Sequence, residues 1–373
     1  MRNFLLLLVV LFSSCNEILK EESLEQKFLK YTSYANKAEL CICENQFEQA
    51  KMFYDALLGI DVPTHAREKY NYAICNLKLE DSLSALKTFE DLYQNKYEGM
   101  YLHILKYKSN YANRKLSELD ESLFSESERI FEIDQKANGN KYNDYENYFN
   151  TVKANVQRIK DVIVKLNDID NSNFSIDRSK LYLPILHYFQ MKSFVNKVAE
   201  DSTFAMKRPV YSCLKNKVLE DLAFEELLRN QVFLGHFDRY SFASLFRTKE
   251  QDAGNTIVYQ FNNYRVIHSP EQLKDSIVSK FNKNRESFFL ENFDDYYKKV
   301  KSYDLSYNDG DLFPLLSVKH EGSEKRYQKR SLYNSSENFK LVNGYIITFQ
   351  YNNDADAKNY YERYIKTHFK KKE

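Results

Sequence analysis

Tryptophan is absent from this 373-residue sequence, and glycine is scarce, with 8 residues in the whole chain. Loops that cradle a phosphate or a dinucleotide need closely spaced glycines, because only glycine lets the backbone approach such a ligand. No such pattern occurs, and the motifs of serine hydrolases, zinc proteases and calcium loops are missing as well. We therefore expect no cofactor.

The chain also lacks an excess of either charge, with 54 basic and 53 acidic residues. A general nucleic-acid binder needs a net or clustered positive field. The one dense basic cluster, residues 370–372, is at the C-terminus, where such side chains are usually solvated. We expect no nucleic-acid partner.

Cysteine is nearly as scarce, with 5 residues, and no CxxC pair occurs. Cys41 and Cys43 are two positions apart in a helical stretch, so their side chains point to different faces. Cysteine packs as a small hydrophobic residue, which favours buried free thiols. A disulfide from Cys75 to one of these two stays open as the alternative. The 7 histidines are scattered along the sequence, and we expect no metal site.

The N-terminus carries an uninterrupted apolar run over residues 4–12. A membrane-spanning helix needs about 20 apolar residues, so this run is too short to span. Arg2 precedes it, and Ser13, Ser14 and Cys15 follow, an order typical of a secretory signal.

The cysteine at its end resembles a bacterial lipoprotein signal, although Phe12 stands where that signal usually has leucine. The resemblance implies that residues 1–14 are removed and that Cys15 receives a lipid. It implies an extracytoplasmic protein of the cell envelope, anchored to a bacterial membrane, most often the outer one. Residues 15–25 would form a tether. An ordinary signal peptide cut near Ser14 is the alternative.

Residues 26–140 contain a repeated pattern of small and aromatic residues. Three positions recur after 35 residues: Ala50, Tyr54 and Leu57 return as Ala85, Phe89 and Leu92. Ala38 and Ala73 have the same offset upstream. Such an offset is typical of stacked helical hairpins, in which alanine allows two helices to approach closely. A degenerate third hairpin is expected over residues 97–135.

These positions resemble tetratricopeptide (TPR) repeats, with Lys69 as a departure where a large residue like Tyr34 is expected. In that family the first helix of each hairpin lines a groove for a protein or peptide. The resemblance therefore points Glu39, Arg67, Tyr70 and Lys78, with Cys43, toward a partner. A generic helical bundle is the alternative.

Residues 141–252 are predicted to be helical. Apolar residues recur at alternating steps of four and three, which is a heptad seam. Its members are Tyr145, Phe149, Val152, Val156, Ile159, Ile163 and Leu166. A long helix packed on its own domain is the preferred interpretation, and a dimerising coiled coil is the alternative.

A cluster of ionisable residues follows in the same region. Asp221, Glu225 and Arg229 share one helix face, and His236 and Asp238 lie just beyond, before Arg239. A His-x-Asp pair can perform acid–base chemistry. A solvated ion-pair ladder is the simpler interpretation, because no nucleophile stands beside it.

Residues 253–373 are predicted to form an α+β domain. Alternating segments at 256–261, 264–268, 315–319 and 326–333 favour strands, and Asn343-Gly344 favours a two-residue hairpin turn. A helix is expected from residue 270 to about 303, with a break near residues 282–284, and another over residues 354–369.

The sequence thus predicts a mainly α protein with a C-terminal α+β part: TPR-like hairpins, a helical region, and a small antiparallel sheet with helices. The function expected is that of a lipid-anchored adaptor or scaffold that binds a protein or peptide. The alternative is an extracytoplasmic enzyme, or a lipoprotein that binds a small ligand or glycan, with its site in the C-terminal half.

Overall fold

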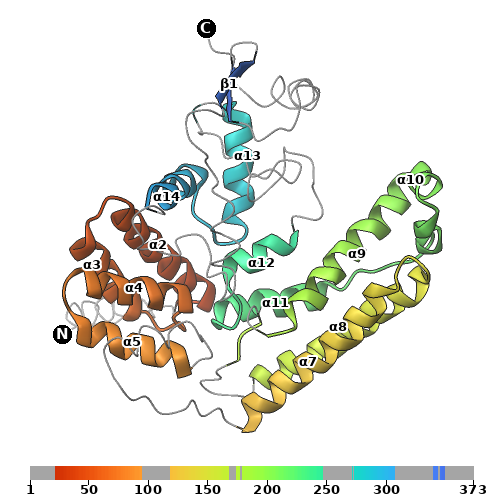
Figure 1. Cartoon of the computed structure of the whole chain (residues 1–373), viewed down its shortest axis with the longest axis horizontal. Helices are drawn as coiled ribbons and strands as arrows, with labels where there is room; N and C mark the ends of the chain where they lie inside the picture. The colour runs from red at the N-terminus through yellow and green to blue at the C-terminus, as the bar shows by residue number, and fades with distance from the viewer. Residues whose placement is uncertain are drawn as a thin grey trace, which may run out of the picture.

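The computed structural model describes residues 22–94, 118–167, 174–176, 179–246, 271, 273–306, 339–342 and 345–348. Two helical hairpins, α2–α3 and α4–α5, lie on one side of the molecule (Figure 1). A long arm of α7, α8 and α9 lies on the other, and α11 and α12 lie between them (Figure 1). The first four helices are α2 (Leu24–Cys43), α3 (Phe47–Leu58), α4 (Ala66–Lys78) and α5 (Ser82–Gln94).

The two hairpins repeat each other in their turns as well as in their buried residues. Asn45 and Glu80, 35 positions apart, both adopt a left-handed backbone, with φ of 57° and 64°. Directly after each, the N–H of Gln46 and of Asp81 donates 2.8 Å hydrogen bonds to Cys41 and Asn76. All the paired positions of the sequence repeat are buried: Ala38, Ala50, Tyr54, Leu57, Ala73, Ala85, Phe89 and Leu92. Both expected hairpins therefore form, up to residue 94.

Local capping explains where several helices begin. The side chain of Ser23 accepts a hydrogen bond from the N–H of Gln26, whose side chain returns the bond to Ser23. This capping box satisfies amide groups that have no partner inside the helix. The side chains of Asp221 and Asp238 accept hydrogen bonds from backbone N–H groups at the start of two later helices, α11 (Leu222–Phe233) and α12 (Arg239–Leu245).

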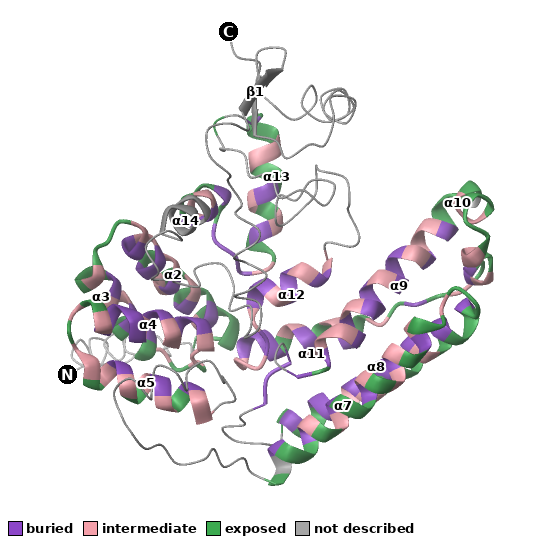
Figure 2. Cartoon of the chain, viewed as in Figure 1, coloured by how far each residue is buried: buried purple, intermediate pink, exposed green. Residues whose placement is uncertain are grey.

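The arm consists of α7 (Glu118–Gly139), α8 (Tyr145–Asn167) and α9 (Tyr182–Glu200), with α10 (Ser202–Lys207) and the 3₁₀ helix η1 (Pro209–Leu214) at its end. All seven residues of the heptad seam are buried, and α8 packs on α7 and α9 (Figure 2). The seam is thus covered by this chain, as the preferred interpretation requires. The boundary expected at residue 140 falls inside the α7–α8 hairpin. The part of the expected third hairpin before Glu118 lies outside the described residues.

The predicted C-terminal α+β domain is wrong. The chain there forms α13 (Asp275–Glu286) and α14 (Phe293–Ser306), which pack on each other, and α14 packs on α2. The break between these two helices falls at residues 287–292. The N–H of Phe293, at the start of α14, donates to the side chain of Asn282 on α13. The apolar faces of these helices are therefore covered by helices and not by a sheet.

The strands described are β1 (Phe339–Val342) and β2 (Tyr345–Thr348), which pair only with each other, antiparallel, with Val342 opposite Tyr345. Two paired strands of four residues do not make a sheet domain. Short alternating segments are weak evidence for a sheet, because their pattern does not say what covers them. The other expected strands, the turn residues Asn343 and Gly344, and the last helix lie outside the described residues.

A large hydrophobic cluster joins the hairpins to the later helices. Phe28 of α2 lies at the junction, with its ring 5.2 Å from Phe233 of α11 and 5.6 Å from Phe289. Gly235 lies close to Pro63 and has a φ of 73°. A Cβ added at this position would lie 2.9 Å from the Cβ of Pro63. The left-handed backbone is strained for a residue with a side chain, and the contact with Pro63 leaves no room for one.

Candidate functional site

The residues predicted to bind a partner divide into two groups. Glu39 and Arg67 are buried, with relative exposures of 0% and 1%. Tyr70 is half-buried with its ring 6.0 Å from Phe89, and the exposed Lys78 has its Nζ 6.0 Å from the Phe47 ring. The prediction that Glu39 and Arg67 line an open groove is therefore wrong, because both face the chain's own later helices.

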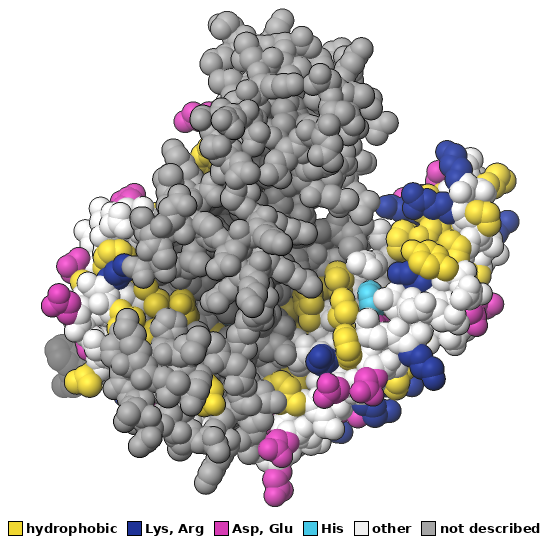
Figure 3. Space-filling view, viewed as in Figure 1, with side chains coloured by type: hydrophobic (Ala, Val, Ile, Leu, Met, Phe, Trp, Pro, Cys, Tyr) yellow, Lys and Arg dark blue, Asp and Glu magenta, His cyan; other side chains and the backbone are white. Residues whose placement is uncertain are grey.

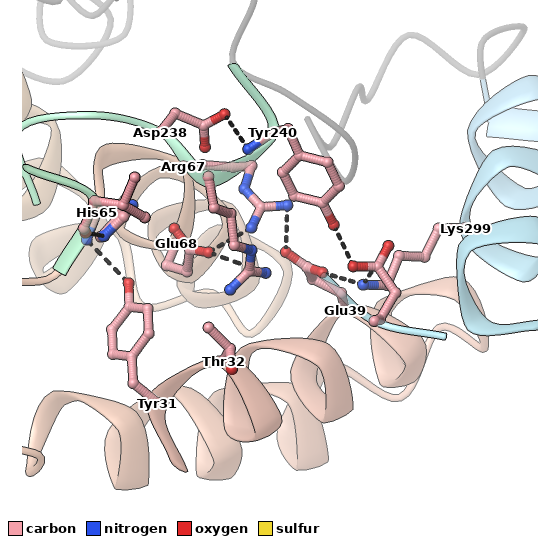
Figure 4. A network of polar contacts seen from close by, with 12 residues as sticks. Tyr31, Thr32, Glu39, His65, Arg67, Glu68, Asp238, Tyr240 and Lys299 are labelled. Carbon is pink, nitrogen blue, oxygen red and sulfur yellow. Dashed lines mark hydrogen bonds and ion pairs between the residues drawn. The ribbon is translucent and has the colours of Figure 1, made fainter. Parts of the chain in front are cut away.

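Arg67 is the centre of a buried ion-pair network (Figure 4). Its Nη1 lies 2.9 Å from Oε1 of Glu39 on α2, and its Nη2 donates a 2.5 Å hydrogen bond to Oε1 of Glu68. Arg239 of α12 approaches Glu68 at 3.7 Å. The guanidinium of Arg67 also lies 4.5 Å from the ring centroid of Tyr240. The network thus connects α2, α4 and α12.

The second half of the network reaches α14 through Lys299, which donates to Glu39 and lies 3.5 Å from Glu291. Tyr240 donates a 2.6 Å hydrogen bond to Glu291, and Arg285 forms an ion pair with the same carboxylate at 3.2 Å. All of these side chains are nearly or fully buried. Three carboxylates and four cations are therefore enclosed where the repeat hairpins meet the C-terminal helices.

The charges of the network stabilise one another against the cost of burial. Burial opposes ionisation of Glu68, but Arg67 and Arg239 outweigh it and lower the pKa of Glu68 to about 2. Burial likewise opposes the charge of Lys299, yet Glu291 and Glu39 raise its pKa. Burial and Glu291 raise the pKa of Tyr240 to about 12. All these groups stay in one protonation state near neutral pH, so the network suits a structural role better than proton transfer.

The cluster around His236 is also held by structural hydrogen bonds. Nδ1 of His236 lies 3.0 Å from the side-chain oxygen of Gln231. The carboxylate of Asp238 accepts from the N–H groups of Tyr240 and Ser241 at the start of α12. Burial and the nearby His65 lower the pKa of His236 to about 4. The expected His-x-Asp pair therefore does not form in this structure.

The three residues on the preceding helix face have separate partners. Asp221 pairs with Lys160 at 2.5 Å, and Glu225 pairs with Lys192. Arg229 donates to the carbonyl of Ser287. These contacts join segments distant in sequence, so the three residues do not form a ladder with one another.

The four cysteines in the described part of the chain are free thiols. Burial, with a smaller contribution from Cys41, raises the pKa of Cys75 to about 12. A thiol held in its neutral form is a poor nucleophile and a poor metal ligand. The four cysteines are therefore free thiols, as expected, and the alternative disulfide from Cys75 is not formed in this structure.

Arg285, Glu291 and Lys299 were not predicted from the sequence, and Arg239 was placed in the cluster around His236 and not in this network. No helical spacing relates Lys299 to Glu39, because 260 residues separate them.

Among the described helices, none combines the length and the hydropathy that a membrane span requires. Within the same residues, no three side chains of His, Cys, Asp or Glu gather as a metal site would need. Cys15 lies outside the described residues. Comparison with family models, with curated proteins and with solved structures finds no match to this chain.

Proposed function

We propose that the chain is an extracytoplasmic, lipid-anchored scaffold that binds a protein or peptide partner on the outside of its two repeat hairpins. The observation that carries this proposal is the burial of the first-helix face. Glu39 pairs with Lys299 of α14, and Arg67 lies over the ring of Tyr240 of α12, so the chain's own later helices cover the first-helix face. A partner must then use the surface that remains accessible.

That surface carries partly exposed aromatic residues beside lysines. Tyr34 and Phe53 have ring centroids 6.4 Å apart, and the exposed Lys37 lies within 5.9 Å of both. Tyr70 and Lys78 lie on α4. Tyrosine is among the residues that most often contribute binding energy at interfaces, because it combines apolar area with a polar group. An acidic or aromatic peptide segment suits this combination.

Replacing Tyr70 by Ala together with Lys78 by Glu is expected to abolish co-purification of a partner from detergent-solubilised membranes. The matched control is Tyr142→Ala with Lys141→Glu, which makes the same changes on the α7–α8 turn, and it should keep the partner. Circular dichroism verifies that both variants are folded. Equal recovery of the partner with both variants would show that the partner does not bind the hairpins through Tyr70 and Lys78. Loss with His236→Ala alone, in a folded protein, would favour the enzyme alternative.

We propose further that Cys15 is the anchor. The pattern before Cys15 supports this, and the first capped helix begins at Leu24, which leaves only a short tether. A fatty-acid analogue fed to the producing cells should label the wild type, and Cys15→Ala should lose the label and leave the membrane fraction. A wild type without label would instead support the ordinary signal peptide, and equal labelling of both proteins would place the lipid on another residue.

A further inference from the structure

The end of the arm carries an unusual local composition. We call arm tip the segment made of α10, η1 and residues 215–218. Over residues 202–219 the sequence has four cations, Lys207, Arg208, Lys215 and Lys217, and no aspartate or glutamate. The whole chain, in contrast, is almost neutral. Glu200 and Asp201 precede this segment and Glu220 and Asp221 follow it, so the positive charge is confined to the arm tip itself.

Large apolar side chains are exposed in the same place. Met206 is 77% exposed and Val218 is 73% exposed. Figure 3 shows hydrophobic side chains at this end of the arm with Lys and Arg side chains around them. Exposed apolar groups that gather in one place with polar residues around them mark interaction sites. The arm tip thus has the composition of an interaction surface.

A rigid aromatic support lies beneath these side chains. The ring of Tyr211 stacks on Phe194 at 4.8 Å and on Phe204 at 5.5 Å, with interplanar angles of 18° and 9°. Arg208 lies 5.4 Å from the centroid of Phe204. Stacked rings of this kind resist deformation, so the arm tip presents its Met, Val and cationic side chains in a fixed arrangement.

Several acidic side chains near the arm tip have partners of their own, such as Glu220 with Lys192 and Asp221 with Lys160. Asp201 accepts hydrogen bonds from the N–H and hydroxyl of Thr203 at the start of α10. Glu146 pairs with Lys217 at 2.9 Å. Lys207 and Lys215 are exposed, and neither forms an ion pair with another described residue. Positive charge at the arm tip is therefore available to an external anion.

We infer that the arm tip docks onto an anionic lipid surface, with Met206 and Val218 at the level of the headgroups and the lysines on the phosphates. The arm tip is the convex end of a protruding arm (Figure 1), which suits a planar surface better than an extended peptide. Interfacial binding combines buried apolar area with attraction between Lys or Arg and anionic lipids. This contact is separate from the proposed anchor at Cys15 and from the proposed partner surface.

The absence of tryptophan allows a direct test on the full chain. Met206→Trp supplies a single tryptophan at the arm tip, and Leu83→Trp supplies one on α5, at a residue that is 83% exposed. Each protein is mixed with vesicles of phosphatidylcholine and phosphatidylglycerol that carry brominated acyl chains. Emission from Met206→Trp should be quenched and shifted to shorter wavelengths, and emission from Leu83→Trp should not change.

Charge dependence completes the test. Adding Lys207→Glu and Lys215→Glu to Met206→Trp should reduce the quenching to the level of Leu83→Trp. Adding Lys30→Glu and Lys87→Glu, an equal charge change at exposed sites on α2 and α5, should leave it intact. Vesicles of pure phosphatidylcholine should give no quenching. The inference is overturned by an unquenched Met206→Trp, by equal quenching at both tryptophans, or by equal loss in both charge variants.

Discussion

Arg67→Ala is expected to lower the free energy of unfolding by about 3 to 5 kcal/mol, because it leaves buried carboxylates without their compensating charge. Glu39 and Glu68 each lie within 3 Å of the Arg67 guanidinium, at 2.9 Å and 2.5 Å. Neither carboxylate can reach water after the change, since both are at most 1% exposed. Urea unfolding followed by circular dichroism measures the loss.

Lys51→Ala is the matched control for this experiment. Lys51 pairs with Asp55 at 2.7 Å, but both side chains are substantially exposed, at 31% and 48%. An exposed pair of this kind contributes about 0.3 to 0.5 kcal/mol, so the control should stay close to the wild type. A loss below about 1 kcal/mol for Arg67→Ala would contradict the structural role of the network. A double-mutant cycle of Arg67→Ala with Glu39→Ala measures the interaction free energy between Arg67 and Glu39.

Acidification from pH 7 to pH 4 is expected to destabilise the protein through its buried histidines. His65 is 4% exposed, and its Nε2 lies 3.0 Å from the carbonyl of Val232 at the end of α11. Burial lowers the pKa of His65, and burial with the charge of His65 lowers the pKa of His236 to about 4 from the usual 6.5. Below pH 6.5 the unfolded chain binds protons that the folded chain does not, so stability falls as the pH falls.

The size of this effect follows from the shift at His236. Each pKa unit corresponds to about 1.4 kcal/mol, so His236 alone accounts for a loss on the order of 3 kcal/mol by pH 4. At lower pH the loss continues, because the pKa of Glu68 in the folded protein is about 2. Urea midpoints at pH 7, 5.5 and 4.5 measure the dependence, and His236→Gln should make it shallower. A midpoint that does not change between pH 7 and 5 would show that the histidines are accessible to protons in the native state.

The sequence by itself determined the local structure of this protein. Alanine and aromatic residues at an offset of 35 specify two hairpins, since the same small and large side chains must pack at each helix crossing. The heptad seam specifies the buried face of α8, and capping residues such as Ser23 specify where helices start. The seam and the caps depend on neighbours within one or two turns, and each hairpin joins helices adjacent in sequence, so a sequence pattern records these features directly.

Only the tertiary structure decided what covers each face. Glu39 and Arg67 occupy positions that point toward a groove in related architectures, yet here the groove is filled by α12 and α14. The same holds for the C-terminal helices, where α14 packs on α2 and on α13. Lys299 and Glu39 are 260 residues apart, and no local periodicity links them. A charge can be buried only where such distant partners compensate it, so the sequence alone did not show that these residues are buried.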